Sequence, residues 1–303
     1  MNLEEFITSK AFECGFGAVG IATVSPCLSI ERYNLWLKQN KHGTMSYLER
    51  GAELRADPRN LLPEAKSIIV VAVQYPVNPS PSSGIAMYAR FPDYHVVIRK
   101  KLKTLVQSIE SELSRKIRAR ICVDSAPLLE REWAVRAGIG WIGKQGQVVN
   151  QNLGACILLG ELLLDVELRP SVLPGTEFQN DMCGNCNKCV ESCPAGAIEP
   201  DRTVDARKCI AYLTVEHEGD LPAEFHEKIG KRIFGCDTCT AVCPWNHNGN
   251  KKLMPEFTRP LITDLDPEEI LEMSEFDFRQ KFKNTVLIRT GLDRLKRNIK
   301  KMV

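Results

Sequence analysis

The chain has 303 residues, and its 40 lysines and arginines against 38 aspartates and glutamates give a formal net charge of +2. With 26% charged and 44% hydrophobic residues, this composition excludes a disordered chain, a collagen-like fibre and a uniformly basic nucleic-acid-packing protein. The length permits a substantial buried core and predicts roughly two domains of ~150 residues.

The N-terminal part of the chain, residues 1–170, has the pattern of a mixed α/β domain. Hydrophobic periodicity predicts helices over residues 3–14, 29–39, 95–117 and 127–137. Strands are predicted over residues 15–22, 67–75, 120–123 and 155–164. The run at 67–75 is apolar and β-branched almost throughout, as expected for a strand that is buried on both faces of a sheet. A glycine-rich loop follows at 138–146, and the fold class predicted for the whole chain is α+β.

The N-terminus contains no pattern of a secretory signal or a membrane anchor. Its first 13 residues include three glutamates and no long apolar run. The longest apolar run, at 155–164, is interrupted by Glu161 and is shorter than the ~18 residues that span a bilayer. We therefore expect a cytoplasmic protein without membrane association. Clustered cysteines in a reducing compartment are metal ligands or catalytic groups more often than disulfides.

Eight of the 12 cysteines lie between residues 183 and 243. The first four form the motif Cys-x2-Cys-x2-Cys-x3-Cys-Pro, which has the spacing of a ferredoxin-type [4Fe–4S] site. A shorter motif, Cys-x2-Cys-x3-Cys-Pro, begins at Cys236, and Cys209 supplies its missing member. Because the fourth cysteine of such a motif binds the other cluster, the predicted ligand sets are Cys183, Cys186, Cys189 and Cys243 for one cluster, and Cys193, Cys209, Cys236 and Cys239 for the other.

Zinc is the alternative occupant of four-cysteine sites. Zinc ligands arrive as separated Cys-x2-Cys pairs, whereas here they arrive as a triplet closed by Cys-Pro. We therefore predict a ferredoxin-like domain over residues 171–250 with two [4Fe–4S] clusters that relay electrons. The other four cysteines are expected to be small core residues; they are Cys14, Cys27, Cys122 and Cys156.

Asp124 is the first candidate catalytic residue, since it follows a predicted strand and precedes a helix that begins with Pro127. A carboxyl group at this place is either a general acid whose pKa burial raises or a helix N-cap. Position alone favours the cap. Tyr94 and His95, at the start of another helix, either contact a cofactor or stabilise the structure.

The last segment, 251–303, is predicted to be a helical tail in which charge is strongly segregated. Residues 261–277 carry seven acids and no base, whereas 279–303 carry nine bases and one acid. Such a basic run is either a solvated helix face or a surface that contacts phosphates. The candidate nucleic-acid contacts are Arg289, Arg294, Lys296, Arg297 and Lys300.

Several segments together resemble the epoxyqueuosine reductases, and the resemblance covers essentially the whole chain. They are HGTMSYLER (42–50), LRADPRNLLPEAKSIIVVAVQY (54–75), YARFPDYHVVIRKKL (88–102), VDSAPLLEREWAVRAGIGWIGK (123–144), LLGELLLD (158–165), CGNCNKCVESCPAGAI (183–198) and GKRIFGCDTCTAVCPWN (230–246). The cluster motifs alone are shared with many reductases, so the N-terminal segments decide the family.

The resemblance implies a cobalamin cofactor between the N-terminal domain and the ferredoxin-like domain. It also implies a tRNA substrate with epoxyqueuosine at the wobble position, which is reduced to queuosine in the last step of queuosine biosynthesis. Electrons would pass through the two clusters to cobalamin, and Asp124 matches the family's proton donor. The segments that line the family's cofactor pocket contain Arg55, Tyr94, His95, Asp124, Trp141, Lys144 and Gln145.

Two other functions share part of this pattern. A cobalamin-dependent reductive dehalogenase has the same two-cluster relay, but the chain has no twin-arginine export signal. A ferredoxin-type electron carrier would leave the N-terminal domain without a role. We expect a monomer that receives electrons from a separate, unidentified donor. Longer members of the family continue into a helical-repeat domain that forms part of their tRNA surface, so the basic tail 279–303 is expected to contact tRNA alone or to be less specific.

Overall fold

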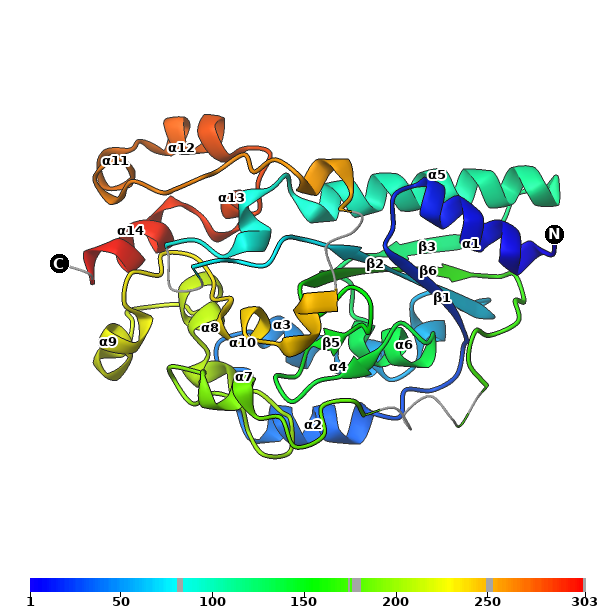
Figure 1. Cartoon of the computed structure of the whole chain (residues 1–303), viewed down its shortest axis with the longest axis horizontal. Coiled ribbons are helices and arrows are strands. Elements are labelled where there is room, and N and C mark those ends of the chain that lie inside the picture. Colours follow the sequence, from blue (N-terminus) through cyan, green and yellow to red (C-terminus); the bar gives the residue numbers. More distant parts are fainter. Residues whose placement is uncertain (81–83, 174, 176–180, 249–252, 302–303) are drawn as a thin grey trace.

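The computed structural model describes residues 1–80, 84–173, 175, 181–248 and 253–301. Its centre is a four-stranded antiparallel sheet with the strand order β1-β2-β6-β3 (Figure 1). The four strands confirm the predicted ones: β1 (Ala18–Thr23), β2 (Ser67–Gln74), β3 (Ala119–Cys122) and β6 (Ile157–Leu164). A small hairpin pairs β4 (Trp141–Ile142), within the glycine-rich loop, with β5 (Val148–Val149), just after it.

Every residue of β2 is buried, because helices cover both faces of the sheet. On one face, α1 (Leu3–Glu13) and α5 (Tyr94–Leu113) pack against side chains such as Ile69 and Val71. On the other face, α6 (Glu130–Arg136) packs against Ile68 and Val70, which alternate with the first pair. This two-sided burial explains why the sequence of β2 is apolar without a break.

Helix boundaries differ from the predicted ones where the backbone makes a special turn. Helix α5 ends at Leu113 because Ser114 adopts a left-handed conformation with φ of 52°. Helix α6 begins at Glu130 rather than at Pro127, and its N-cap is Leu129. The prediction that Asp124 caps this helix is therefore wrong. The other helices before the cysteine region are α2 (Ile30–Lys38), α3 (Ser46–Arg50) and α4 (Ala52–Arg55).

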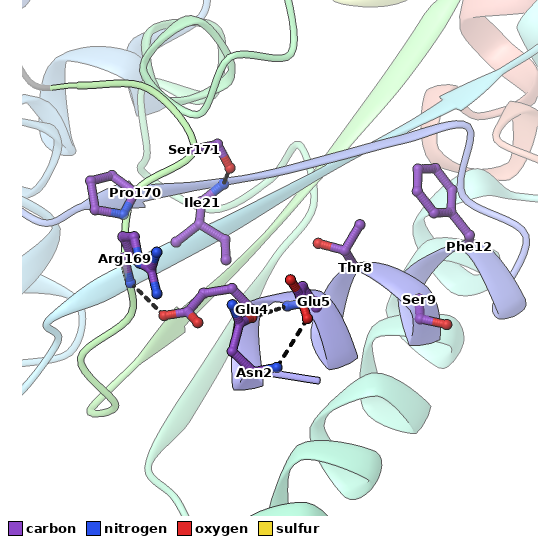
Figure 2. Close-up of a pocket in the computed structure, with 10 residues that line it drawn as sticks. All are labelled: Asn2, Glu4, Glu5, Thr8, Ser9, Phe12, Ile21, Arg169, Pro170 and Ser171. Carbon is purple, nitrogen blue, oxygen red and sulfur yellow. Dashed lines mark hydrogen bonds between the residues drawn. The ribbon is translucent and has the colours of Figure 1, made fainter.

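The start of α1 is tied to the segment that follows β6 (Figure 2). Asn2 and Glu5 form a reciprocal capping box, in which the Glu5 amide donates to Asn2 Oδ1 at 2.8 Å. The neighbouring Glu4 accepts from the Arg169 amide at 2.8 Å, and Ser171 Oγ accepts from an amide of β1 at 2.9 Å. These bonds fix the shallow depression between α1 and residues 169–171 as a structural junction.

The C-terminal half consists of short helices and has its own apolar core. These helices are α7 (Lys188–Glu191), α8 (Ile210–Val215), α9 (His226–Ile229), α10 (Thr238–Ala241), α11 (Pro267–Glu272), α12 (Glu275–Phe282), α13 (Leu287–Thr290) and α14 (Leu292–Lys300). Phe278, Phe282 and Leu295 of the tail pack with Phe234 and with Ile85 of the N-terminal part. Asn298 is fully buried and donates to two backbone carbonyls at 2.8 Å. The tail thus packs against both preceding parts of the chain. No helix within the described ranges is long and apolar enough to cross a membrane.

Gly20 of β1 offers a direct test of how closely α6 approaches the sheet. A Cβ atom at this position would lie 1.9 Å from the carbonyl oxygen of Ala137. We expect Gly20→Ala to lower the free energy of unfolding by about 1–3 kcal/mol or more, measured by chemical denaturation. In the control Gly84→Ala, the nearest atom, in Ile233, is 3.5 Å away, so little change is expected. Equal stability of the two variants would contradict the close approach.

Candidate functional site

A cavity of about 850 Å³ lies where the three parts of the chain meet. Its walls come from α2–α4, the start of α5, the loop from β3 to α6, the cysteine region and the tail. The charged lining contains six arginines and four carboxylates, counted as Arg32, Arg55, Arg131, Arg202, Arg289, Arg294, Asp124, Glu130, Glu132 and Glu216. Such a lining suits an anionic ligand, and aromatic side chains line the same cavity at Tyr33, Trp36, Tyr47, Tyr88 and Tyr94.

Asp124 stands on the cavity wall, hydrogen-bonded to a histidine. It follows β3 with a left-handed backbone (φ 57°), and its side chain is 58% exposed to the cavity although protein groups surround it. His95 Nε2 lies 3.0 Å from Asp124 Oδ2, and His95 Nδ1 lies 2.7 Å from Asp93 Oδ1. The ring of Tyr94 stacks on the imidazole with 4.0 Å between centroids. The result is a histidine held between two carboxylates.

The electrostatics of this group differ from the sequence-based expectation. Burial on its own would raise the pKa of Asp124, but the hydrogen bond and the positive charge of His95 outweigh it and lower that pKa. Burial likewise acts to lower the pKa of His95, and the two carboxylates reverse this, so that its pKa is raised. The expectation of a raised pKa for Asp124 is wrong in sign, because the neighbouring imidazole was not visible in the sequence. The dissociable proton is held on His95.

A pH-dependent contribution to stability follows from this arrangement. Because the pKa of His95 is raised in the folded state, the stabilisation is complete below its unfolded value of ~6.5 and is lost as pH rises through the folded value. We expect the difference in Tm between the wild type and His95→Gln to be largest near pH 6 and to shrink at higher pH. A difference that does not change between about pH 6 and 9 would show that His95 is neutral in the folded protein.

Arg55 is the strongest candidate for holding a bulky polar ligand in this cavity. Its side chain is buried, with 7% exposed, and its Nη1 atom has no hydrogen-bond partner among the described residues. The guanidinium also lies 5.7 Å from the ring centroid of Tyr33. A buried donor without a partner is costly, and an amide or phosphate of a ligand in the cavity would satisfy it. Cobalamin carries both groups, so this wall fits the implied cofactor.

The structure places three of the residues implied as cofactor contacts outside the cavity lining. Trp141 Nε1 donates to Cys183 Sγ at 3.4 Å, and Lys144 Nζ donates to Asn187 Oδ1 at 2.8 Å. Gln145 is buried, and its Nε2 atom has no partner among the described residues. Ile142 and Gly146 of the same loop do line the cavity. The loop therefore faces the cysteines with one side and the cavity with the other. A resemblance over the whole segment does not distinguish these two sides.

None of the eight clustered cysteines forms a disulfide, and most of their electrostatic interactions fall within two groups. Cys243 interacts with Cys183, Cys186 and Cys189, whereas Cys239 and Cys209 both interact with Cys236 and Cys193; Cys239 also interacts, more weakly, with Cys189 of the first group. Burial is the first cause of the raised pKa of Cys239 and Cys243, and neighbouring thiolates add to it. In the described part of the chain, no three ligand groups stand close enough to share one metal ion. A cube requires a wider arrangement, because each thiolate binds a different iron.

The remaining four cysteines confirm their prediction as core residues. Cys27, Cys122 and Cys156 are buried, and Cys14 is partly buried against the same core. Burial raises the pKa of Cys27 to about 12 and that of Cys122 to about 11. They are therefore unreactive thiols at neutral pH.

The five candidate nucleic-acid contacts of the tail differ in their surroundings: two line the cavity, two are partly buried and one is exposed. Arg289 and Arg294 line the cavity, and Arg289 Nη2 donates to Ser125 Oγ at 3.5 Å, beside Asp124. Lys296 donates to the Met273 carbonyl at 2.8 Å. Arg297 donates to three carbonyls around the end of α8, which belong to Leu213, His217 and Gly219. Lys300 is exposed. Contact with nucleic acid by these five residues stays a prediction.

Two acidic residues near Asp124 are absent from the predicted site residues. Glu130 lines the cavity and accepts from the Asp124 amide at 2.6 Å. Glu161 lies in β6 and is fully buried. The sequence does indicate that Glu161 is unusual, because it is the one charged residue in an otherwise apolar strand.

Two family models match the chain. The model "Epoxyqueuosine reductase QueG, DUF1730" matches residues 55–125, and "4Fe-4S double cluster binding domain" matches residues 182–246. Among curated proteins, an epoxyqueuosine reductase of Leadbetterella byssophila is 40% identical over 97% of this chain and 96% of its own length. The epoxyqueuosine reductase of Escherichia coli is 37% identical over 98% of this chain and 80% of its own length.

Solved structures agree with these matches. A crystal structure of an epoxyqueuosine reductase with an epoxyqueuosine-modified tRNA-Tyr stem loop has a TM-score of 0.87 and 32% identity. It covers 99% of this chain and 80% of that chain. The Bacillus subtilis enzyme, in a structure whose catalytic aspartate loop is swung out of the active site, has a TM-score of 0.86 and 31% identity over 99% of this chain and 80% of its own.

Proposed function

This chain belongs to the epoxyqueuosine reductase family, and we propose that it reduces epoxyqueuosine at the wobble position of a tRNA anticodon to queuosine. The observation that carries the proposal is the single cavity in which the Asp124–His95 pair meets the tail arginines. A proton donor for a departing epoxide oxygen and cations for backbone phosphates are what this substrate requires. The arginine-rich lining supports an anionic substrate over a small neutral one.

The chain contains groups that fit both implied cofactors. The two sets of four cysteines would hold two [4Fe–4S] clusters. Arg55, Tyr94 and the wall around Asp124 would hold cobalamin. When bound, the clusters supply single electrons and the cobalamin supplies the low-potential reductant for the epoxide. The finer division into a cobalamin-binding domain (1–170), a ferredoxin-like domain (171–250) and a tail (251–303) is part of this proposal.

Three residues of the chain, Asp93, His95 and Asp124, hold and transfer the proton. Asp93 fixes the orientation of His95 from behind, and the imidazole holds the proton that Asp124 needs. His95 passes that proton to Asp124 over the 3.0 Å hydrogen bond. Asp124 is the more exposed of the pair to the cavity, so it delivers the proton to the substrate oxygen, and the second proton comes from solvent. Reduction of the epoxide with two electrons and two protons releases its oxygen as water and leaves the alkene of queuosine.

The decisive experiment is turnover of the modified tRNA. Protein reconstituted anaerobically with iron, sulfide and cobalamin is incubated with a chemical reductant and epoxyqueuosine tRNA, and nucleosides are analysed by mass. We expect conversion to queuosine. Corrinoid binding without conversion would favour another substrate, such as an organohalide. Failure to bind corrinoid would favour an electron carrier.

A further inference from the structure

The loop that carries Asp124 is attached to a pair of carboxyl groups, one partly buried on the cavity wall (Glu130) and one fully buried (Glu161). The Asp124 amide donates to Glu130 Oε1 at 2.6 Å, and this bond holds a backbone whose φ is +57°. A left-handed conformation is disfavoured for a residue with a side chain and persists only where surrounding contacts impose it. Glu130 opens α6, so it connects the catalytic loop to a helix that packs on the sheet.

Behind Glu130 lies Glu161, which cannot be understood as an ordinary core residue. It pairs with Val70 and Cys122 on the neighbouring strands, and its alternation with Leu163 directs it to the face that α6 covers. Its side chain is fully buried, and no donor among the described residues reaches either carboxyl oxygen. The carboxyl of Glu130 interacts with it. Two carboxyl groups bond to each other only when one of them carries a proton, so one must.

We propose that Glu130 is a positioning residue that holds Asp124 in the active site, and that a protonated Glu161 donates to Glu130 and keeps it in place. In this arrangement Glu161 acts as a neutral hydrogen-bond donor, although it is an acid. One oxygen of Glu130 accepts a hydrogen bond from the Asp124 amide, and the remaining lone pairs of its carboxylate are available to accept one from the protonated Glu161. The protonated oxygen of Glu161 then has a partner, which neither of its carboxyl oxygens otherwise has among the described residues.

The charges around the pair support this assignment of the proton. Burial, then the charge of Glu130, raises the pKa of Glu161 well above its usual range; Cys122 and Asp124 act in the same direction. For Glu130, burial and Asp124 raise the pKa to about 7, whereas the hydrogen bonds with Glu161 and the Asp124 amide, and the charge of Arg131, oppose the rise. Above about pH 7 Glu130 is a carboxylate, and its bond to the amide is charge-assisted. Below that pH the bond weakens.

Hydrogen–deuterium exchange of the loop 123–129, measured on the full chain without tRNA, tests whether Glu130 holds this loop in place. We expect Glu130→Gln to lower the protection of this loop about tenfold at pH 8, since the charge-assisted bond is lost. In the wild type, protection corrected for intrinsic exchange should fall as pH drops through about 7. In Glu130→Gln this fall should be absent, and only the opposite dependence of the His95–Asp124 pair, whose stabilisation decreases as pH rises, should remain. Unchanged protection in this variant would overturn the proposal.

Two variants of Glu161 test whether its side chain acts as a neutral hydrogen-bond donor or as a charged group. The amide of Glu161→Gln still donates to Glu130, so protection and turnover should remain near those of the wild type. Glu161→Leu removes the donor and should lower both. If Glu161→Gln is as damaged as Glu161→Leu while both fold, Glu161 is not a neutral donor and the proposal fails.

Kinetics provide the second readout, and this part rests on the proposed function. We expect Glu130→Gln to lower kcat by about 10²-fold, the scale of a misplaced catalytic group, with little change in KM for the tRNA. A changed KM with unchanged kcat would assign Glu130 to substrate binding and overturn its positioning role. Absence of turnover in the wild type would refute the proposed function alone, because the exchange experiment tests the loop independently.

Discussion

Asp124→Asn is expected to lower kcat by about 10²–10⁴-fold, the range that a positioned proton donor contributes. The amide still accepts a hydrogen bond from His95 over the 3.0 Å contact, but it cannot pass a proton to the substrate oxygen. Because the variant preserves the size of the side chain, cobalamin binding should not change. Nucleoside analysis of the tRNA measures turnover, and the absorption spectrum of the bound corrinoid measures the cofactor.

The control for this variant is the same chemical change at an exposed acid outside the cavity. Asp264 lies in the tail, where its side chain accepts only from the neighbouring Leu265 amide among the bonds described. Asp264→Asn should leave turnover and cofactor binding at wild-type values. If Asp124→Asn behaves like this control, the carboxyl group of Asp124 has no part in the reaction, and the proton must come from elsewhere in the cavity.

The sheet could be predicted from sequence because burial leaves a direct trace in composition. The continuous apolar runs of β2 and β6 identified these strands to within a few residues. The short helices α3 and α4 gave no comparable signal, since four or five residues show no helical period. The start of α6 was also missed, because Pro127 permits a helix but the chain first forms the turn that carries Asp124.

Some residues of the candidate cavity could be predicted from the sequence, but their electrostatics could not. Motif spacing singled out the cysteines, and the end of a predicted strand together with the family resemblance singled out Asp124; these are local features of the chain. The sign of the pKa shift of Asp124 depends on His95, which is 29 positions away and reaches it only in the folded chain. The same holds for Glu130 and Glu161, which meet across a helix and a strand. Likewise, only the fold separates Trp141, against the cysteines, from Ile142, on the cavity.

Removal of Cys193 together with Cys239 is expected to abolish turnover and to leave one cluster intact. If the ligand sets cross between the motifs, these two cysteines bind the same cluster, as their electrostatic interaction in the structure supports. The double variant Cys193→Ser/Cys239→Ser should then retain about half of the iron and sulfide of the wild type. Turnover should fall below detection, because the electron relay needs both clusters.

The matched variant Cys189→Ser/Cys193→Ser removes two cysteines of one motif and distinguishes the two ways of sharing ligands. With crossed sets it damages both clusters, so iron should fall well below half; with each motif holding its own cluster, this variant would retain half and the first would lose both. Cys14→Ser, outside the cluster region and partly buried, controls for a general effect of losing a thiol. The electron paramagnetic resonance of the reduced proteins provides an independent count, since two neighbouring clusters couple and a single one does not. The iron content of the two double variants therefore shows whether the ligand sets cross between the motifs. Crossed ligands require both motifs to fold around both clusters as one unit.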